Sequence, residues 1–159
     1  MVQYVRNKLE FRGTPDTLNP IVQQLVSDDG KVPISFSKIV PLNDEGEMEE
    51  KWGIPSEPEE MDWILYRDGT YLEYSFDTCN KTPLPIFQKL AEMYPDRFIK
   101  VEFASEDYGE NCGIYKKAEG STELIFEEPD YEPLVFACEI WGIDPEEEMA
   151  ERMINEYEE

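Results

Sequence analysis

The sequence predicts an α+β domain in which two helices pack on one face of an antiparallel sheet. Three features of the sequence lead to this prediction. Short segments alternate apolar and polar residues, as strands do, and other segments repeat apolar residues every three or four positions, as helices do. Turn-forming residues separate these segments. The 159 residues suffice for one domain with a buried core.

The first strand and the first helix are predicted within the first 30 residues. Residues 2–11 are rich in Val, Tyr, Leu and Phe and form the expected strand. Thr14 is a suitable helix cap, with Pro15 at the first helical position. Pro20 either kinks this helix or marks a later start with Asn19 as the cap. One apolar stripe identifies the buried side of the helix: Leu18, Ile21, Val22 and Leu25.

The middle of the chain is expected to hold a short strand, a surface excursion and a hairpin. The strand is predicted in "VPISFSKIVP", residues 32–41. Residues 43–62 are acidic, with few apolar anchors, and are expected to cross the surface with Trp52 exposed. Residues 63–78 alternate as a hairpin that turns at Asp68-Gly69.

The segment "SFDTCNKTPLPIFQKLAEMYP", residues 75–95, indicates a strand that leads into a second helix. Thr82 is the expected cap, followed by Pro83 and Pro85 in the first turn, where the missing N–H groups have no helical partner. The predicted apolar stripe consists of Leu84, Phe87, Ala91 and Tyr94.

Three more strands and two closing helices complete the prediction. The strands fall within residues 97–107 and 112–128, and the helices within residues 131–143 and 144–159, the latter capped by Asp144. This order indicates a ferredoxin-like α+β fold with acidic C-terminal helices. Residues 1–130 would form the ferredoxin-like domain, and residues 131–159 a helical extension packed on it.

Four short patterns resemble the YubB ferredoxin-like family. They are "NKLEFRGTPD", "ISFSKIVP", the Trp52-Gly53 pair and "YSFDTCNKTPLPIFQKLAEMYPD", and the similarity runs over residues 7–118. The resemblance implies a ferredoxin-like fold and an origin in phages, plasmids or integrated elements. It implies no iron–sulfur cluster and no catalytic residues. The sequence departs from the family at residues 79–81 and in its acidic C-terminal helices.

The residue types argue against most catalytic and metal chemistry. The chain contains no histidine, so a nucleophilic Cys79 would lack the base that activates a thiol. The three cysteines lack CxxC spacing, which indicates a reducing compartment and no zinc site. With no apolar run at the N-terminus, a cytoplasmic protein is expected. We therefore expect no enzyme activity, no metal and no cofactor.

The net charge of −23 is concentrated in two segments. Residues 44–62 carry nine acids and one lysine, and residues 119–159 carry fifteen acids and one arginine. Such a charge repels nucleic acid and anionic membranes and attracts basic surfaces. Each acidic segment can also be read simply as a solvated face that keeps the protein soluble.

The charge leads to the main functional hypothesis, an inhibitor that presents carboxylates in place of nucleic-acid phosphates. Its partner would be a basic host nuclease or nucleic-acid-binding protein of the restriction or CRISPR type. An apolar stripe in the last helix, formed by Met149, Ala150, Met153, Ile154 and Tyr157, would pack on the body and leave acids outside. The predicted contacts are Glu49, Glu50, Glu59, Glu60, Glu146, Glu147, Glu148 and Glu151.

The sequence is also compatible with two other classes of function. A small-molecule binder or weak enzyme could use the sheet face near Tyr74, Asp77 and Cys79. It would show a concave pocket there, and a thiol of Cys79 more reactive than those of Cys112 and Cys138. A structural or assembly protein would form a stable homo-oligomer with its acidic faces exposed.

Overall fold

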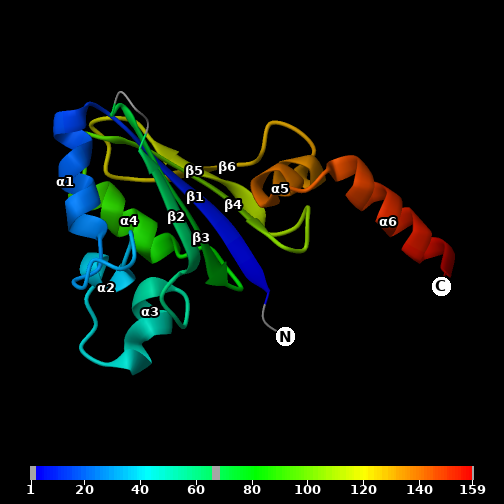
Figure 1. The fold of residues 1–159 in the computed structure, drawn as a ribbon, viewed down its shortest axis with the longest axis horizontal. Coiled ribbons are helices and arrows are strands. Elements are labelled where there is room, and N and C mark those ends of the chain that lie inside the picture. The colour runs from blue at the N-terminus through cyan, green and yellow to red at the C-terminus, as the bar shows by residue number, and fades with distance from the viewer. Residues whose placement is uncertain (1–2, 66–68, 159) are drawn as a thin grey trace.

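The computed structural model describes residues 3–65 and 69–158 of the chain (Figure 1). Its centre is a six-stranded antiparallel sheet with the strand order β2-β3-β1-β4-β5-β6. The strands are β1 (Tyr4–Arg12), β2 (Glu59–Leu65), β3 (Tyr71–Cys79), β4 (Phe98–Ser105), β5 (Cys112–Lys117) and β6 (Ile125–Glu127). The first four follow the predicted ferredoxin-like order, and β5 and β6 extend the sheet beyond β4.

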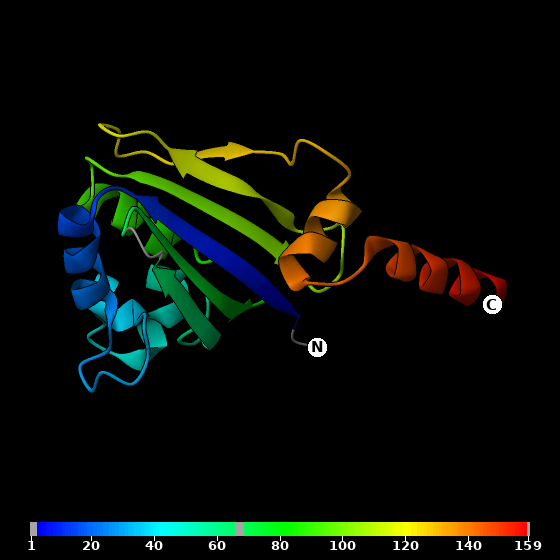
Figure 2. The same cartoon turned by 45° about the horizontal axis from the view of Figure 1, so that its top comes forward.

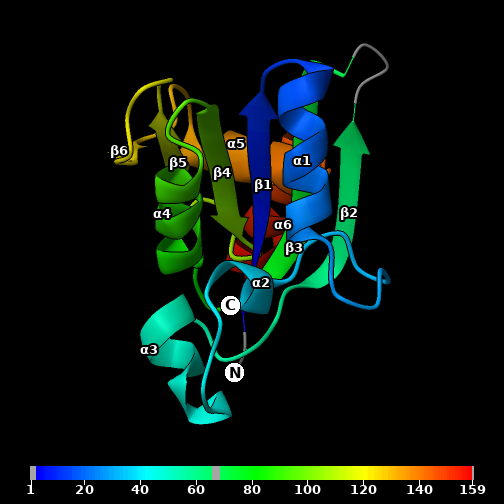
Figure 3. The same cartoon turned by 90° about the vertical axis from the view of Figure 1, so that its left-hand side faces the viewer.

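Two helices cover one face of this sheet, as the sequence predicts. They are α1 (Pro15–Leu25) and α4 (Leu84–Met93), which lie side by side in front of the strands in Figure 3. Residues of β1 and β3 alternate between this face and the other, and the inward ones are fully buried. Their aromatic rings meet edge to face, with Phe11 and Tyr74 6.5 Å apart between centroids.

The first helix begins where the sequence predicts, with Thr14 as its N-cap. The backbone N–H of Thr14 donates to the hydroxyl of Thr17 at 2.8 Å. Pro20 lies inside the helix, so the alternative start at Asn19 is wrong. The predicted stripe is confirmed, because Leu18, Ile21 and Leu25 are buried and Val22 packs against the core.

The strand predicted in residues 32–41 is wrong, because its centre forms the short helix α2 (Phe36–Ile39). A distant carboxylate stabilises this turn. Glu57 accepts the backbone N–H groups of Phe36 and Ser37, each at 2.9 Å. These N–H groups belong to the first turn of α2, where a helix has no internal acceptor for them.

The excursion of residues 43–62 has more structure than predicted. It contains the 3-10 helix η1 (Glu45–Glu47), the helix α3 (Met48–Trp52) and the beginning of β2. The prediction of an exposed Trp52 is wrong, because only 1% of its surface is accessible. Its ring lies edge-on to Phe36, and its indole N–H donates to the carbonyl of Val40 at 2.8 Å.

The hairpin and the helix after it largely follow the prediction. Strands β2 and β3 pair antiparallel, although Asp68 of the expected turn lies outside the described residues.

The helix α4 starts at Leu84 with Pro83 as its cap, one residue later than predicted. Thr82 is not the cap because its hydroxyl donates to the side chain of buried Asn7 at 2.6 Å. Leu84 is exposed, and the buried residues of α4 are Ile86, Phe87, Leu90 and Ala91.

The two C-terminal helices differ in how they attach to the body. The first, α5 (Pro133–Trp141), packs on the sheet face opposite α1 and α4, where Phe136, Ala137 and Ile140 surround Ala104. The second, α6 (Pro145–Glu158), projects from the body and ends far from the sheet (Figures 1 and 2). The extension predicted for residues 131–159 therefore packs on the domain through α5 and not along α6.

Candidate functional site

The acidic helix α6 is the most distinctive surface element of the structure. Asp144 caps it as predicted, because its carboxylate accepts the backbone N–H of Glu146 at 2.9 Å. Glu146, Glu147 and Glu151 are exposed. Three acids in the first turn also interact favourably with the positive end of the helix dipole, so the charge helps the projecting helix to form.

The apolar stripe of α6 is exposed, and the prediction that it packs on the body is wrong. Met149, Met153 and Ile154 are 51%, 59% and 57% exposed. The side chain of Tyr157, also assigned to this stripe, lies outside the described side chains. Met149 and Met153 lie one turn apart on the same face, and Ile154 borders that face, so the exposed apolar side chains lie on one side of the projecting helix.

The orientation of α6 is set by polar contacts. The guanidinium of Arg152 donates to the carbonyl of Tyr108 at 2.8 Å and to the carboxylate of Glu148 at 3.1 Å. Successive residues turn by about 100° around a helix. Glu148 and Arg152 therefore lie roughly opposite the apolar stripe, so anchoring them to the body turns that stripe outward. Of the predicted contacts on α6, Glu148 is half-buried and already paired within the chain.

The predicted partner-binding glutamates outside α6 do not lie on the same surface as this helix. Glu49 and Glu50 are exposed on α3, which packs near α4 and lies well away from α6 in Figures 1 and 2. Glu59 and Glu60 are exposed at the start of β2, where the pairing register with β3 shifts and Glu60 adopts φ 49°. The structure thus places the eight predicted residues in three separate groups.

Arg6 links the sheet to the helix α5, a role that sequence reasoning missed. Its guanidinium binds both carboxylate oxygens of Asp77, at 2.8 and 3.1 Å. The same group lies 4.2 Å from the ring centroid of Trp141, and the Trp141 indole donates to the carbonyl of Ala104 at 2.9 Å. The hydrogen bond to Asp77 is the main reason why the pKa of Arg6 is raised.

The residues around Cys79 do not form one catalytic group. Cys79 and Asp77 face the side of the sheet opposite Tyr74, because they alternate with it along β3. The thiol of Cys79 lies 3.7 Å from the hydroxyl of Ser56. Burial raises the pKa values of Cys112 and Cys138. In the described part of the chain, no three His, Cys, Asp or Glu residues are placed to hold a metal ion.

The loop after Cys79 serves the fold. The amide of Asn7, which is fully buried, donates to the hydroxyl of Thr78 at 3.0 Å and accepts from Thr82. The Thr78 hydroxyl also contacts the carbonyl of Lys81 at 2.8 Å. These bonds satisfy polar groups that would be costly to bury alone and fix the turn between β3 and α4.

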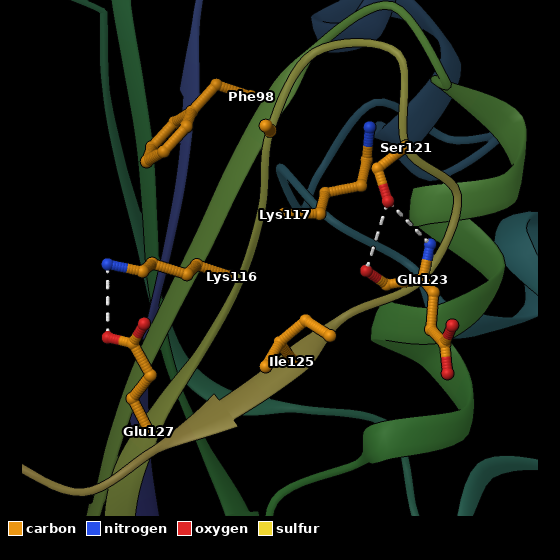
Figure 4. Close-up of a pocket in the computed structure, with 8 residues that line it drawn as sticks. Phe98, Lys116, Lys117, Ser121, Glu123, Ile125 and Glu127 are labelled. Atoms are coloured by element: carbon orange, nitrogen blue, oxygen red, sulfur yellow. Dashed lines mark hydrogen bonds and ion pairs between the residues drawn. The ribbon is translucent and has the colours of Figure 1, made fainter.

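A cavity of about 400 Å³ lies beside β6 (Figure 4). Phe98 and Ile125 supply apolar surface, and Lys116 pairs with Glu127 at 3.0 Å on one side of the cavity. Lys117 also lines this cavity, but its ammonium donates to the carbonyls of Tyr94, Pro95 and Arg97 at 2.9, 3.2 and 2.6 Å. Lys117 is therefore a structural residue that closes the connection between α4 and β4.

The two neighbouring lysines should respond very differently to replacement by Met. Lys117→Met leaves three carbonyl groups without their shared donor and should lower the free energy of unfolding by about 2–3 kcal/mol. Lys116→Met removes a half-exposed ion pair and should cost less than about 1 kcal/mol. Urea denaturation of both variants measures this difference. Equal costs for the two variants would contradict the structural role of Lys117.

The described helices include none that is both long and apolar enough to span a membrane.

Neither a curated protein nor a solved structure matches the chain. A family model for the ferredoxin-like domain in Api92-like proteins matches residues 48–151, about two thirds of the sequence. This match begins later than the resemblance to the YubB family and extends into α6, and it agrees with the α+β sheet topology. The chain belongs to the family of ferredoxin-like domains in Api92-like proteins.

Proposed function

We propose that this protein is a non-enzymatic inhibitor that binds the basic surface of a nucleic-acid-binding protein through α6. The helix would occupy the surface on which nucleic acid binds and thereby block it. The partner class is a host defence protein of the restriction or CRISPR type, and the origin of the chain is a phage or plasmid. The charge supports a partner with a basic surface, and the resemblance to the YubB family supports both the origin and the choice of a host defence protein.

One observation carries the proposal, the joint exposure of acidic and apolar side chains on α6. Exposed apolar surfaces rimmed by polar residues are typical of protein–protein contacts. Met149 and Met153 lie one turn apart, and methionine adapts its shape well to a partner surface. An amphipathic helix of this kind binds by placing its apolar side in a groove while charges at the rim set orientation.

The charges of α6 fit a surface that binds phosphates. Carboxylates three or four residues apart on a helix are separated by about 5–6 Å. The phosphates of one DNA strand rise by about 3.4 Å along the axis per charge. Both arrays therefore place like charges a few ångströms apart along one direction, although the two intervals are not equal. The C-terminal segment, residues 119–159, carries a net charge of −14 and would also accelerate the encounter with a basic partner.

The geometry narrows the predicted contact set to one helix. Glu146, Glu147 and Glu151 share α6 with the apolar stripe, so one partner surface can meet both. Glu49 and Glu50 on α3, and Glu59 and Glu60 at the start of β2, would require a partner that wraps around the molecule. Glu148 is less available because it binds Arg152. We therefore propose α6 as the primary contact.

The experiment compares three immobilised proteins that capture their partner from a lysate of the host at low salt. They are the wild type, the variant Glu146→Gln/Glu147→Gln/Glu151→Gln, and a control with the same charge change, Glu92→Gln/Asp96→Asn/Glu110→Gln. All six acidic residues are exposed. The α6 variant should release the captured protein at lower salt, with an affinity reduced about tenfold, because it lacks the charges that meet the basic surface.

The matched control separates a local contact from the effect of overall charge. It should behave like the wild type if α6 is the binding surface. If both variants lose affinity equally, the attraction comes from net charge and the α6 interface is wrong. If neither variant changes the affinity or its salt dependence, the proposal of a phosphate mimic is wrong.

A further inference from the structure

The strand β6 leaves one edge of the sheet open on the side away from β5. It is the last strand in the sheet order, and the structure places no strand beyond it among the residues it describes. Its two apolar side chains are unusually accessible: Ile125 is 57% exposed and Phe126 is 47% exposed. An open edge presents backbone N–H and C=O groups that can pair with another extended chain.

Two cavities flank β6, and successive residues of the strand border them in turn. The cavity of about 400 Å³ is lined by Glu123, Ile125 and Glu127 (Figure 4). A second cavity of about 320 Å³ is lined by Phe126 and Glu128. Successive residues of a strand point to opposite faces. A chain added to this edge would therefore direct alternate side chains toward the two cavities.

The acidic residues around β6 favour a positively charged segment at this edge. Residues 119–132 contain six acids, Glu119, Glu123, Glu127, Glu128, Asp130 and Glu132, and no lysine or arginine. Only Glu127 has an ion-pair partner among the described contacts of this segment, namely Lys116 at 3.0 Å. A second copy of this chain would bring acidic segments together, so like charges disfavour pairing between two β6 strands.

We propose that β6 is a docking edge for an extended segment of a partner protein that contains both basic and apolar residues. The segment pairs with the outer edge of β6 as an additional strand. Its backbone hydrogen bonds supply affinity, its apolar side chains enter the two cavities beside Ile125 and Phe126, and its cations meet the acids of residues 119–132. This site is separate from α6 and does not depend on the function proposed for that helix.

The test uses full-length protein and, as the probe, a blocked peptide of three consecutive valines flanked on each side by two lysines, so that successive valines point to both faces of the sheet. Its matched control has the same sequence with N-methylated valines, which keeps the charge and removes the N–H groups that pair with a strand. Two protein variants are compared with the wild type, Ile125→Lys and Ile154→Lys. They introduce the same charge at positions that are equally exposed, 57% in each case, on β6 and on α6.

Calorimetric titration should show about a tenfold loss of affinity for Ile125→Lys and less than about twofold for Ile154→Lys. The N-methylated peptide should bind the wild type about tenfold more weakly than the probe, because strand addition relies on backbone hydrogen bonds. Amide chemical shifts should change along residues 124–128. Unchanged melting temperatures of both variants show that the fold is retained.

Three results would overturn this inference. Equal binding of the N-methylated peptide would show attraction by charge alone, and equal losses in the two lysine variants would show that β6 is not the site. Absence of binding to the wild type would show that the short acidic strand only protects the edge. The Gln variant of α6, Glu146→Gln/Glu147→Gln/Glu151→Gln, should bind the peptide within about twofold of wild type. Failure of either proposal therefore leaves the other testable.

Discussion

Replacing Trp52 with Ala should lower the free energy of unfolding by about 3–5 kcal/mol, the range observed for removal of a large buried aromatic side chain. Trp52 is 1% exposed and contacts Phe36 edge to face at 5.7 Å between ring centroids. Its indole N–H also satisfies the carbonyl of Val40. The substitution therefore opens a cavity between α2 and α3 and leaves a polar group unpaired. Urea denaturation measures the loss.

Trp52→Phe is the matched control for this experiment. It keeps an aromatic ring next to Phe36 but lacks the indole donor and part of the volume, so it should cost distinctly less than Trp52→Ala. Hydrogen exchange of residues 44–54 should speed up in the Ala variant, because Trp52 anchors this acidic segment to the core. A loss below about 1 kcal/mol for Trp52→Ala would show that residue 52 is not buried as described.

Replacing Arg6 with Met should destabilise the protein by about 3 kcal/mol, at the lower end of the range for breaking a buried ion pair. The side chain of Asp77 is only 7% exposed, and its carboxylate would lose the guanidinium that binds both of its oxygens. The side chain of Arg6 is 28% exposed, so solvent screens the ion pair and the expected loss of stability lies at the lower end of that range. The substitution also removes the cation that lies over the Trp141 ring. Chemical denaturation gives the magnitude.

The double variant Arg6→Met/Asp77→Asn separates these two contributions. It removes the uncompensated charge of Asp77 and should recover part of the stability, whereas the contact with Trp141 stays lost. Fluorescence of the tryptophans and exchange of the α5 amides report on the packing of this helix. If the double variant is no more stable than Arg6→Met, the unpaired carboxylate is not the main cost.

The elements with regular local patterns could be predicted from the sequence. The alternation in β3, the stripe of α1 and the cap at Asp144 are all confirmed, because each depends on residues close together in the chain. The antiparallel β2–β3 hairpin and the ferredoxin-like strand order are confirmed as well. The periodicity of apolar residues and the chemistry of helix caps are sufficient to predict such elements.

The errors arise where a distant residue decides the local structure. The segment around Phe36 has strand-like composition, but the carboxylate of Glu57 binds its N–H groups and stabilises a helical turn. Thr82 is a good cap by type, yet its hydroxyl donates to Asn7 in β1, so α4 begins one residue later. Neither Glu57 nor Asn7 is adjacent in sequence, so no local pattern indicates these contacts.

The largest error concerns the surface of α6, and it changes the proposed interface. The amphipathic pattern correctly predicts a helix, but a free-standing helix and a packed helix share that pattern. The contact between Arg152 and the carbonyl of Tyr108 decides the orientation. Exposure of Met149, Met153 and Ile154 adds an apolar component to a surface that charge alone had suggested.

A competition experiment with nucleic acid tests most directly whether α6 blocks a phosphate-binding surface. The protein captured by the wild type is bound to a short fluorescent DNA duplex, and this chain is then added while anisotropy is recorded. The anisotropy should fall to the value of free DNA, and the Gln variant of α6 should require about ten times more protein for the same effect. A stable ternary complex, with no release of DNA, would contradict the proposed function.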